Sequence, residues 1–298
     1  MITTKKMRDS KTRIGTILSA SCMTDMPAFY PQQLIEAVET RRKKGVPIHT
    51  LVLWTKHPAS MLKEPLYSYL MGLRHNGIQL YIQLTITGMG SLQMGVDLNG
   101  NPIVIEPHAP KWEDSVAELP KVIELVGSPL RIRLRIDPIL RFKDAAGVTQ
   151  SNLEYMPKII EATAPLGIKT YNFSFVEDKN DKELDKGHLK VNRRFEKLGA
   201  TILPPTLEER AGIKAWMDEL SNQNSIQILS CATPGMEKSS CINGAWLEQL
   251  HDSHMPTSHK ECPSRALCGC TESIDLGGWP PKKCYTGCLY CYSNPVIE

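Results

Sequence analysis

The chain has 298 residues, a formal net charge of +3 at pH 7 and nine cysteines. A charge this close to neutral gives no support to nucleic-acid binding, and no apolar run approaches the length of a transmembrane helix. The charged, polar N-terminus is unlike a signal peptide, so we expect a cytoplasmic protein whose cysteines are reduced and serve as ligands or redox groups.

The first 250 residues alternate short β-rich runs with helical patterns, which is typical of βα units around a parallel sheet. We favour an α/β fold built as a partial (β/α)6-type, TIM-like barrel over residues 1–250. A doubly wound open sheet and an antiparallel sheet with one solvated face are the alternatives. The expected strands are 13–21, 48–54, 78–87, 130–140, 169–176 and 225–232, and the expected helices are about 30–44, 59–75, 113–126, 151–164, 183–198 and 206–221.

Two of the expected strands alternate between apolar and polar side chains. In 78–87 the isoleucines and leucines share one face, and in 130–140 three arginines and an aspartate share the face opposite the apolar one. Helices would cover the apolar faces, so the polar faces would line a barrel open enough to hold a polar ligand. The polar side chains are Gln79, Tyr81, Gln83, Thr85, Thr87, Arg131, Arg133, Arg135 and Asp137.

Ligands of barrel-like α/β folds gather at the carboxyl ends of the strands, and reactive or polar residues stand at those ends here. Cys22, Thr24 and Asp25 follow the first strand and Lys56 follows the second, and we expect them to face a substrate. Two alternatives stay open: Thr24 and Asp25 could cap the next helix, and Cys22 could be a plain buried thiol. Glu106 lies in the long segment 88–110, which we interpret as a lid or substrate loop.

Beyond residue 251 the periodic pattern gives way to Pro, Gly, Cys and His, and every cysteine except Cys22 lies after residue 230. The string KKCYTGCLYCYSNP places Cys284, Cys288 and Cys291 at CxxxCxxC spacing, with no fourth cysteine close by. Zinc knuckles favour paired CxxC units, whereas an uneven set of three suits a 4Fe–4S cluster with one iron open to a small ligand.

This spacing, with Tyr290 just before the third cysteine, resembles the cluster loop of radical S-adenosylmethionine (SAM) enzymes. The resemblance implies that the three cysteines hold a 4Fe–4S cluster, that SAM binds the open iron, and that Tyr290 packs near the adenine. The string GCLYCYSN is especially similar to the loop of spore photoproduct lyase-type enzymes. Most of the superfamily carries this loop after the first strand. Here it stands near the C-terminus, so we expect the cysteine-rich segment 251–298 to pack on the barrel and deliver the loop to the strand ends.

A SAM ligand would need partners on the strands. A guanidinium can pair with its carboxylate, and a protein carboxylate can accept hydrogen bonds from its ribose hydroxyls. Arg135 and Asp137 are the expected contacts, together with Thr85 and Ser174 on the neighbouring strands. The alternative is that Arg135 and Asp137 pair with each other and only line the barrel.

A wider resemblance, which runs along nearly the whole chain, is to the DUF1848 family of uncharacterised proteins. It is carried by SASCMTDMPAFYP, VLWTKHP, QLTITG, IEPHAP, RIDPIL, FSFVE and CGCTESIDLGGW, followed by the cysteine loop. The family usually has two arginines where this chain has Cys22 and Met23. The resemblance also supports a second, auxiliary cluster on Cys231, Cys241, Cys268 and Cys270. The alternatives at these four cysteines are a structural zinc ion and ordinary buried thiols.

These residues predict a radical SAM enzyme, in which a reduced 4Fe–4S cluster cleaves SAM to a 5′-deoxyadenosyl radical that abstracts hydrogen from an unidentified substrate. The expected partners are SAM, that substrate and an electron donor such as flavodoxin or ferredoxin, with no membrane or nucleic acid. Two other classes stay open: a photoproduct-lyase-like nucleic-acid repair enzyme, and a non-redox TIM-like protein with structural zinc.

Overall fold

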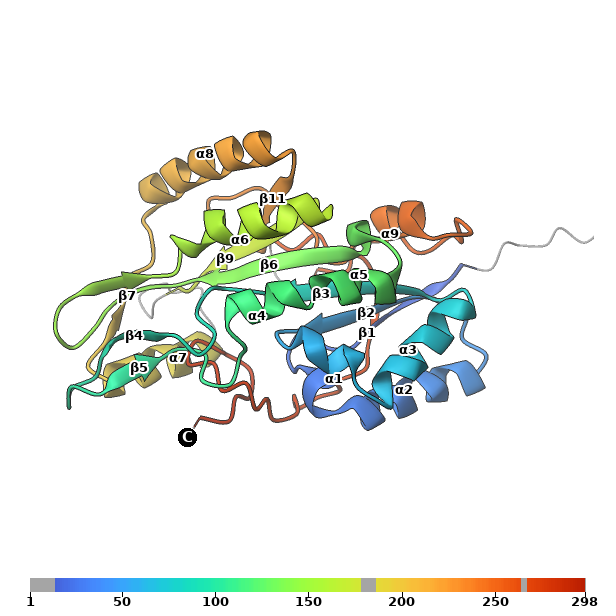
Figure 1. The fold of residues 1–298 in the computed structure, drawn as a ribbon, viewed down its shortest axis with the longest axis horizontal. Coiled ribbons are helices and arrows are strands. Elements are labelled where there is room, and N and C mark those ends of the chain that lie inside the picture. Colours follow the sequence, from blue (N-terminus) through green and yellow to red (C-terminus); the bar gives the residue numbers. More distant parts are fainter. Residues whose placement is uncertain (1–13, 178–185, 264–266, 298) are drawn as a thin grey trace, which may run out of the picture.

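The computed structural model describes residues 14–177, 186–263 and 267–297 (Figure 1). One seven-stranded sheet forms its centre, with all neighbouring strands parallel, in the order β11–β9–β6–β3–β2–β1–β12. The α/β class is confirmed, and each expected run contains one strand of this sheet. The strands are β1 (Thr16–Ser19), β2 (Ile48–Thr55), β3 (Gln79–Thr85), β6 (Ile132–Ile139), β9 (Thr170–Phe175), β11 (Gln227–Ser230) and the unexpected β12 (Ile274–Asp275).

The sheet is open: β11 and β12 are its edges, and no closed sheet occurs among the described residues. From β1 to β11 the strands lie side by side in chain order, whereas a doubly wound sheet reverses its order and carries helices on both faces. Here one hydrophobic core joins the apolar strand faces to most of the helices. These helices are α1 (Met26–Phe29), α2 (Pro31–Lys43), α3 (Leu66–His75), α4 (Trp112–Ala117), α5 (Leu119–Val126), α6 (Tyr155–Thr163) and α8 (Leu207–Asn224).

The predicted alternation of apolar and polar side chains along the strands is confirmed. It explains why the helices pack on the apolar face of the sheet. Leu80, Ile82 and Leu84 of β3 lie in the helix-covered core, as do Ile132 and Leu134 of β6. Short 3-10 turns connect several of these elements: Pro58–Leu62, Pro129–Arg131 and Ala164–Leu166. The expected helix at 59–75 is therefore a 3-10 turn followed by α3, and the one at 113–126 is the pair α4 and α5.

The polar face of the sheet is covered by the chain itself. Segment 240–250, which contains α9 (Gly244–Leu250), packs there through Ile242 and Leu247 against Ile17, Val52 and Tyr81. The side chains of the polar face donate hydrogen bonds to backbone carbonyl oxygens of this segment. Such bonds join Gln83 to Cys241 (2.6 Å), Gln79 to Leu247 (3.0 Å), Arg131 to Leu250 (2.6 Å) and Arg133 to Ser240. This part of the face is therefore not open to a ligand.

Two small antiparallel sheets lie beyond the central one, together with α7 (Lys186–Lys197) (Figure 1). The segment 88–110, expected as a loop, contains the ribbon β4 (Gln93–Val96) and β5 (Pro102–Val104), and the second sheet is β10 (Thr201–Ile202), β7 (Arg141–Lys143) and β8 (Thr149–Ser151). A second core joins Val191 and Phe195 of α7 to Phe142 and to Leu289 and Tyr290 of the cysteine loop. The first residues of the helix expected at 183–198 lie outside the described residues.

Within the described residues, no helix combines the length and the apolar character needed to cross a membrane. The division of the chain at residue 250 stays a prediction, although β12 shows that the later segment adds a strand to the central sheet, beside β1.

Candidate functional site

The three cysteines of the CxxxCxxC string lie on one compact loop, which we call the cysteine loop (residues 281–296). The loop folds back on itself, because the Cys284 N–H donates to Asn294 O at 2.9 Å and the Val296 N–H donates to Cys284 O at 2.9 Å. A tight turn brings the Cys291 N–H to Cys288 O at 3.1 Å. The turn depends on Gly287, whose φ of +71° lies in the left-handed region that favours glycine.

Hydrogen bonds hold the cysteine loop against the residues that follow β1 and β2. After β1, the Thr24 hydroxyl donates to Lys282 O at 3.0 Å, and the Ser293 hydroxyl donates to Met23 O at 2.8 Å. After β2, His57 Nε2 lies 3.0 Å from the Thr286 hydroxyl. The three thiols therefore lie at the carboxyl ends of these strands, beside the predicted substrate residues.

Glu106 accepts hydrogen bonds from the cysteine loop and from the residues that follow β2 and β3. Its side chain is only 2% exposed, and one oxygen, Oε1, accepts hydrogen bonds from Lys56 Nζ at 3.0 Å and from the Thr87 hydroxyl at 2.7 Å. The Tyr290 hydroxyl donates to the same oxygen, and Lys56 Nζ stands 5.6 Å from the centre of the Tyr290 ring. The structure thus brings together three residues that the sequence placed in separate roles, namely Lys56, Glu106 and Tyr290.

Asp25 is buried and performs the capping role that the sequence left open. Its Oδ1 accepts from the Ala28 N–H at 3.0 Å, which caps α1. Its Oδ2 accepts from the Thr55 hydroxyl at 2.9 Å and from the Lys56 N–H at 2.8 Å. Burial raises the pKa of the Asp25 carboxyl, although His57 and these hydrogen bonds act in the opposite direction. The carboxylate therefore ties α1 to the end of β2.

Of the three cysteines of the loop, Cys288 is buried, and Cys284 and Cys291 are half-buried. Burial raises the pKa of Cys288 and Cys291, and the Glu106 carboxylate adds to the rise at Cys288. Arg194 of α7 holds the same turn, since its guanidinium donates to Leu289 O at 3.1 Å and to Cys291 O at 2.5 Å. Nothing in the sequence pattern pointed to Arg194, because one arginine in a basic helix carries no signal of its own.

The other four predicted ligands gather at the ends of β9 and β11. Cys231 Sγ lies 3.4 Å from Cys241 Sγ, and the N–H groups of Cys241 and Ile242 donate to Cys270 Sγ at 3.2 and 3.5 Å. Cys268 joins them through its β-bridge with Ser239, and all nine cysteines of the chain, each within the described residues, are without disulfide bonds.

Arg135 faces this second group of cysteines. Its Nη1 donates to Cys241 Sγ at 2.9 Å, and its other branch pairs with Asp137, which also accepts from the Ser174 hydroxyl. Hydrogen bonds from Cys231 and Cys270 lower the pKa of the Cys241 thiol, and the positive charge of Arg135 lowers it further. Arg135 and Asp137 therefore pair with each other, as the alternative reading of the sequence had it.

Thr85 and Cys22 lie between the two cysteine groups. Thr85 is the register partner of Arg135 across β3 and β6, and it lines a small cavity with Glu106. Cys22 is exposed in the turn after β1, and its charge acts on Arg135. Cys22 is therefore not the plain buried thiol that the sequence allowed.

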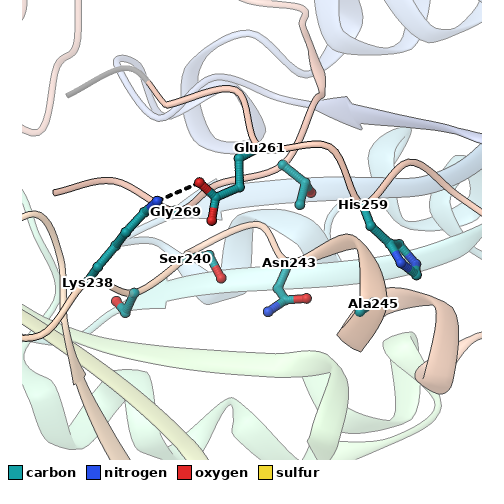
Figure 2. A pocket seen from close by; sticks show the side chains of 9 residues that line it. Lys238, Ser240, Asn243, Ala245, His259, Glu261 and Gly269 are labelled. Atoms are coloured by element: carbon teal, nitrogen blue, oxygen red, sulfur yellow. Dashed lines mark hydrogen bonds and ion pairs between the residues drawn. The ribbon is translucent and has the colours of Figure 1, made fainter. Parts of the chain in front are cut away.

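A larger cavity of about 230 Å³ adjoins the second group of cysteines. Figure 2 shows the side chains of Lys238 and Glu261, which line this cavity, pointing toward each other, and Lys238 Nζ and Glu261 Oε2 are 2.5 Å apart. Ser239, Ser240 and Gly269, which flank the cysteines in the sequence, also line it. Polar groups of the cavity, such as those of Ser239 and Thr271, bond within the protein, so the cavity presents few unpaired groups to a ligand.

The thiols fit an iron–sulfur cluster by their chemistry and grouping. Among the described residues no three or more His, Cys, Asp or Glu side chains converge closely enough to hold a single metal ion. A 4Fe–4S cluster binds each thiolate on a separate iron, so its ligands stand further apart than those of one ion. The three cysteines of the loop, of which Cys288 is buried and the other two are half-buried, and the four around the end of β11 are donor sets of this kind.

A family model described as "Domain of unknown function (DUF1848)" matches residues 17–293, which is nearly the whole chain. No curated protein matches the chain.

Proposed function

The chain belongs to the DUF1848 family, whose function is unknown, and we propose that it is a radical SAM enzyme with an auxiliary iron–sulfur cluster. The observation that carries the proposal is the position of the cysteine loop. Its three thiols, in a CxxxCxxC spacing, lie at the carboxyl ends of parallel strands, where α/β folds bind their ligands. We further propose that the open sheet is a segment of a β/α barrel and that the protein is cytoplasmic, where thiols stay reduced.

Cys284, Cys288 and Cys291 would hold the SAM-binding 4Fe–4S cluster. When bound and reduced, this cluster supplies the electron that cleaves SAM to methionine and a 5′-deoxyadenosyl radical. The chain's own residues would hold the cysteine loop in place. Arg194 donates a hydrogen bond to the carbonyl of Cys291, and the Tyr290 hydroxyl donates to Glu106. Cys288 is buried, which excludes water from its own thiol.

Lys56 supplies a positive charge beside the loop. It is paired with Glu106, and its charge acts on both Cys288 and Cys291. The charge of Lys56 acts to lower the pKa of both thiols, so Lys56 would help to hold the anionic ligands of the cluster. Tyr290 would then pack near SAM while its hydroxyl stays bound to Glu106.

The auxiliary cluster would be held by the second group of cysteines. Arg135 is its counter-charge, because the guanidinium already donates to Cys241 Sγ, and hydrogen bonds to ligand sulfurs stabilise a reduced cluster. Thr85, Asp137 and Ser174 lie beside Arg135 and remain the proposed contacts of SAM and substrate. An external electron donor such as a flavodoxin or ferredoxin completes the system.

A structural zinc ion at the second group is the other candidate, and one pair of its thiols supports it, although among the described residues no three side chains of this group converge as a single ion requires. The 3.4 Å between Cys231 Sγ and Cys241 Sγ is close to the spacing of about 3.8 Å that two thiolates adopt on one tetrahedral zinc. A nucleic-acid enzyme has less support, because Arg131 and Arg133 are buried against segment 240–250 and offer no basic groove.

The test is the metal content of protein purified without oxygen. The proposal predicts about eight irons and eight sulfides per chain, falling by half in the Cys284→Ala, Cys288→Ala, Cys291→Ala variant and by half in the variant with Ala at Cys231, Cys241, Cys268 and Cys270. About four irons with one zinc, the zinc lost only from the second variant, would establish the structural zinc. Zinc alone in the wild type would overturn the proposal.

A further inference from the structure

The exposed aromatic side chains of the described chain concentrate on the last twenty residues or so. The aromatic residues among the exposed large hydrophobics are Trp279 (85% exposed), Tyr285 (47%) and Tyr292 (41%), and all three flank the cysteines of the loop. Tryptophan and tyrosine left in water on one segment are the composition of a binding surface, since these residues dominate the energetics of protein interfaces.

The same segment is basic. Residues 277–297 contain Lys282 and Lys283 and no aspartate or glutamate. Lys283 is exposed, and Lys282 Nζ lies 5.6 Å from the centre of the Tyr30 ring. Neither lysine takes part in an ion pair among the described residues. We call Trp279, Lys282, Lys283, Tyr285 and Tyr292 the tail surface.

The tail surface is one continuous, anchored structure. The Tyr285 ring packs edge-on against Phe29 with centroids 5.5 Å apart, and the Tyr30 hydroxyl donates to Lys283 O at 2.8 Å. Asn294 Nδ2 donates to Pro281 O at 2.9 Å, which joins the end of the cysteine loop to the residue before the two lysines. The backbone is thus fixed, while Trp279, Lys283 and Tyr292 are exposed at the surface.

We infer that the tail surface is the docking site of an acidic one-electron carrier protein, an inference that rests on the proposed function. Its charge is complementary to such a carrier, and Tyr285 and Tyr292 directly adjoin Cys284 and Cys291 in the chain. A carrier seated here would stand next to two of the three thiols. One electron leaves the carrier and reduces the cluster, and no proton or group is transferred.

The experiment uses the anaerobic, cluster-loaded protein and an oxidised flavodoxin, which is acidic, as the probe. Its dissociation constant is measured by calorimetry at two salt concentrations, so binding is read without SAM and without turnover. The Lys282→Glu, Lys283→Glu variant is expected to bind at least about tenfold more weakly and to lose most of the salt dependence, and Trp279→Ala to weaken binding at unchanged salt dependence.

The matched control is Lys43→Glu, Lys44→Glu at the end of α2, just before β2 begins. It makes the same charge change near the amino end of that strand, whereas the cysteine loop lies at the carboxyl end. It should bind as the wild type does. SAM cleavage driven by dithionite should be equal in the wild type, Trp279→Ala and the Lys43→Glu, Lys44→Glu control, and its absence from the wild type would instead reject the proposed function. The inference would be overturned if the Lys43→Glu, Lys44→Glu control weakened flavodoxin binding equally. It would also be overturned if the tail surface bound an oligonucleotide and did not bind flavodoxin.

Discussion

The Tyr290 hydroxyl and the Lys56 ammonium donate hydrogen bonds to the same oxygen of Glu106. Tyr290 and Glu106 are 184 residues apart in the chain, so this one carboxylate fastens the cysteine loop to the segment that follows β5. Glu106 is buried, and its hydrogen bonds to Lys56 and Tyr290 would keep the three thiols of the loop in a fixed arrangement.

Glu106→Gln should destabilise the protein by about 3 kcal/mol, because it leaves the Lys56 ammonium without its charged partner in a largely buried place. The Lys56→Met, Glu106→Gln double variant should lose less than the sum of the two single changes. Urea unfolding under anaerobic, reducing conditions measures both. Strictly additive losses would show that the pair does not act as a unit.

Tyr290→Phe removes only the hydroxyl that reaches Glu106. The expected loss is about 1–2 kcal/mol of stability, with the fold intact, because a hydrogen bond to a charged acceptor is deleted. Iron bound by the cysteine loop should be released faster to a chelator than in the wild type. Tyr285→Phe, on the exposed side of the same loop, is the control and should release iron at the wild-type rate.

Arg131→Met should loosen the cover of the polar sheet face. The Arg131 guanidinium donates to Val126 O at 3.0 Å and to Leu250 O at 2.6 Å, and these carbonyl groups lose their charged donor. A loss of about 2–3 kcal/mol is expected, with faster hydrogen exchange at the amides of α9. Lys121→Met breaks the exposed pair with Glu118 and should cost less than about 0.5 kcal/mol.

Stability should fall on acidification through His49. Burial beside His251, whose ring centroid is 4.4 Å away, lowers the pKa of His49 from 6.5 to about 4. Between these values the unfolded chain binds more protons than the folded one, so stability is present above the unfolded pKa and is lost as pH falls from 6.5 to about 4. His49→Gln should remove about 2 kcal/mol of the change across this window. An unchanged slope in the variant would contradict the assignment.

The midpoint potential of the auxiliary cluster should depend on Arg135. Arg135→Met removes a positive charge and an N–H donor from Cys241 Sγ, so reduction becomes harder and the potential falls, on the order of tens of millivolts. Arg135→Lys keeps the charge and should shift it less. Redox titration followed by electron paramagnetic resonance distinguishes the three proteins, and equal potentials would remove Arg135 from the account.

The strands and their faces could be predicted because a buried, parallel strand carries its information locally. The alternation in β3 and β6 was enough to assign Leu80 and Leu134 to the core. The ribbon β4–β5 was missed because it is short and rich in Gly and Asn, without an apolar period. The two-residue β12 was missed for the same reason.

The sequence could propose residues for the candidate site, but it could not give their contacts. The cysteine spacing points to a ligand set that stays a prediction, and the partners of Gln83 and Arg133 are backbone carbonyl groups, which leave no trace in a sequence. Similarly, Glu106 could be placed in a long segment between strands, yet only the folded chain brings it to Tyr290 and Lys56.

The central claim is that the cysteine loop holds the cluster that cleaves SAM. The most direct measurement is 5′-deoxyadenosine released by the anaerobic protein after addition of dithionite and SAM, compared between the wild type and the Cys284→Ala, Cys288→Ala, Cys291→Ala variant. The account predicts release by the wild type and none by the variant, while the variant keeps the iron of the second group. Equal amounts from both proteins, or none from an iron-loaded wild type, would contradict it.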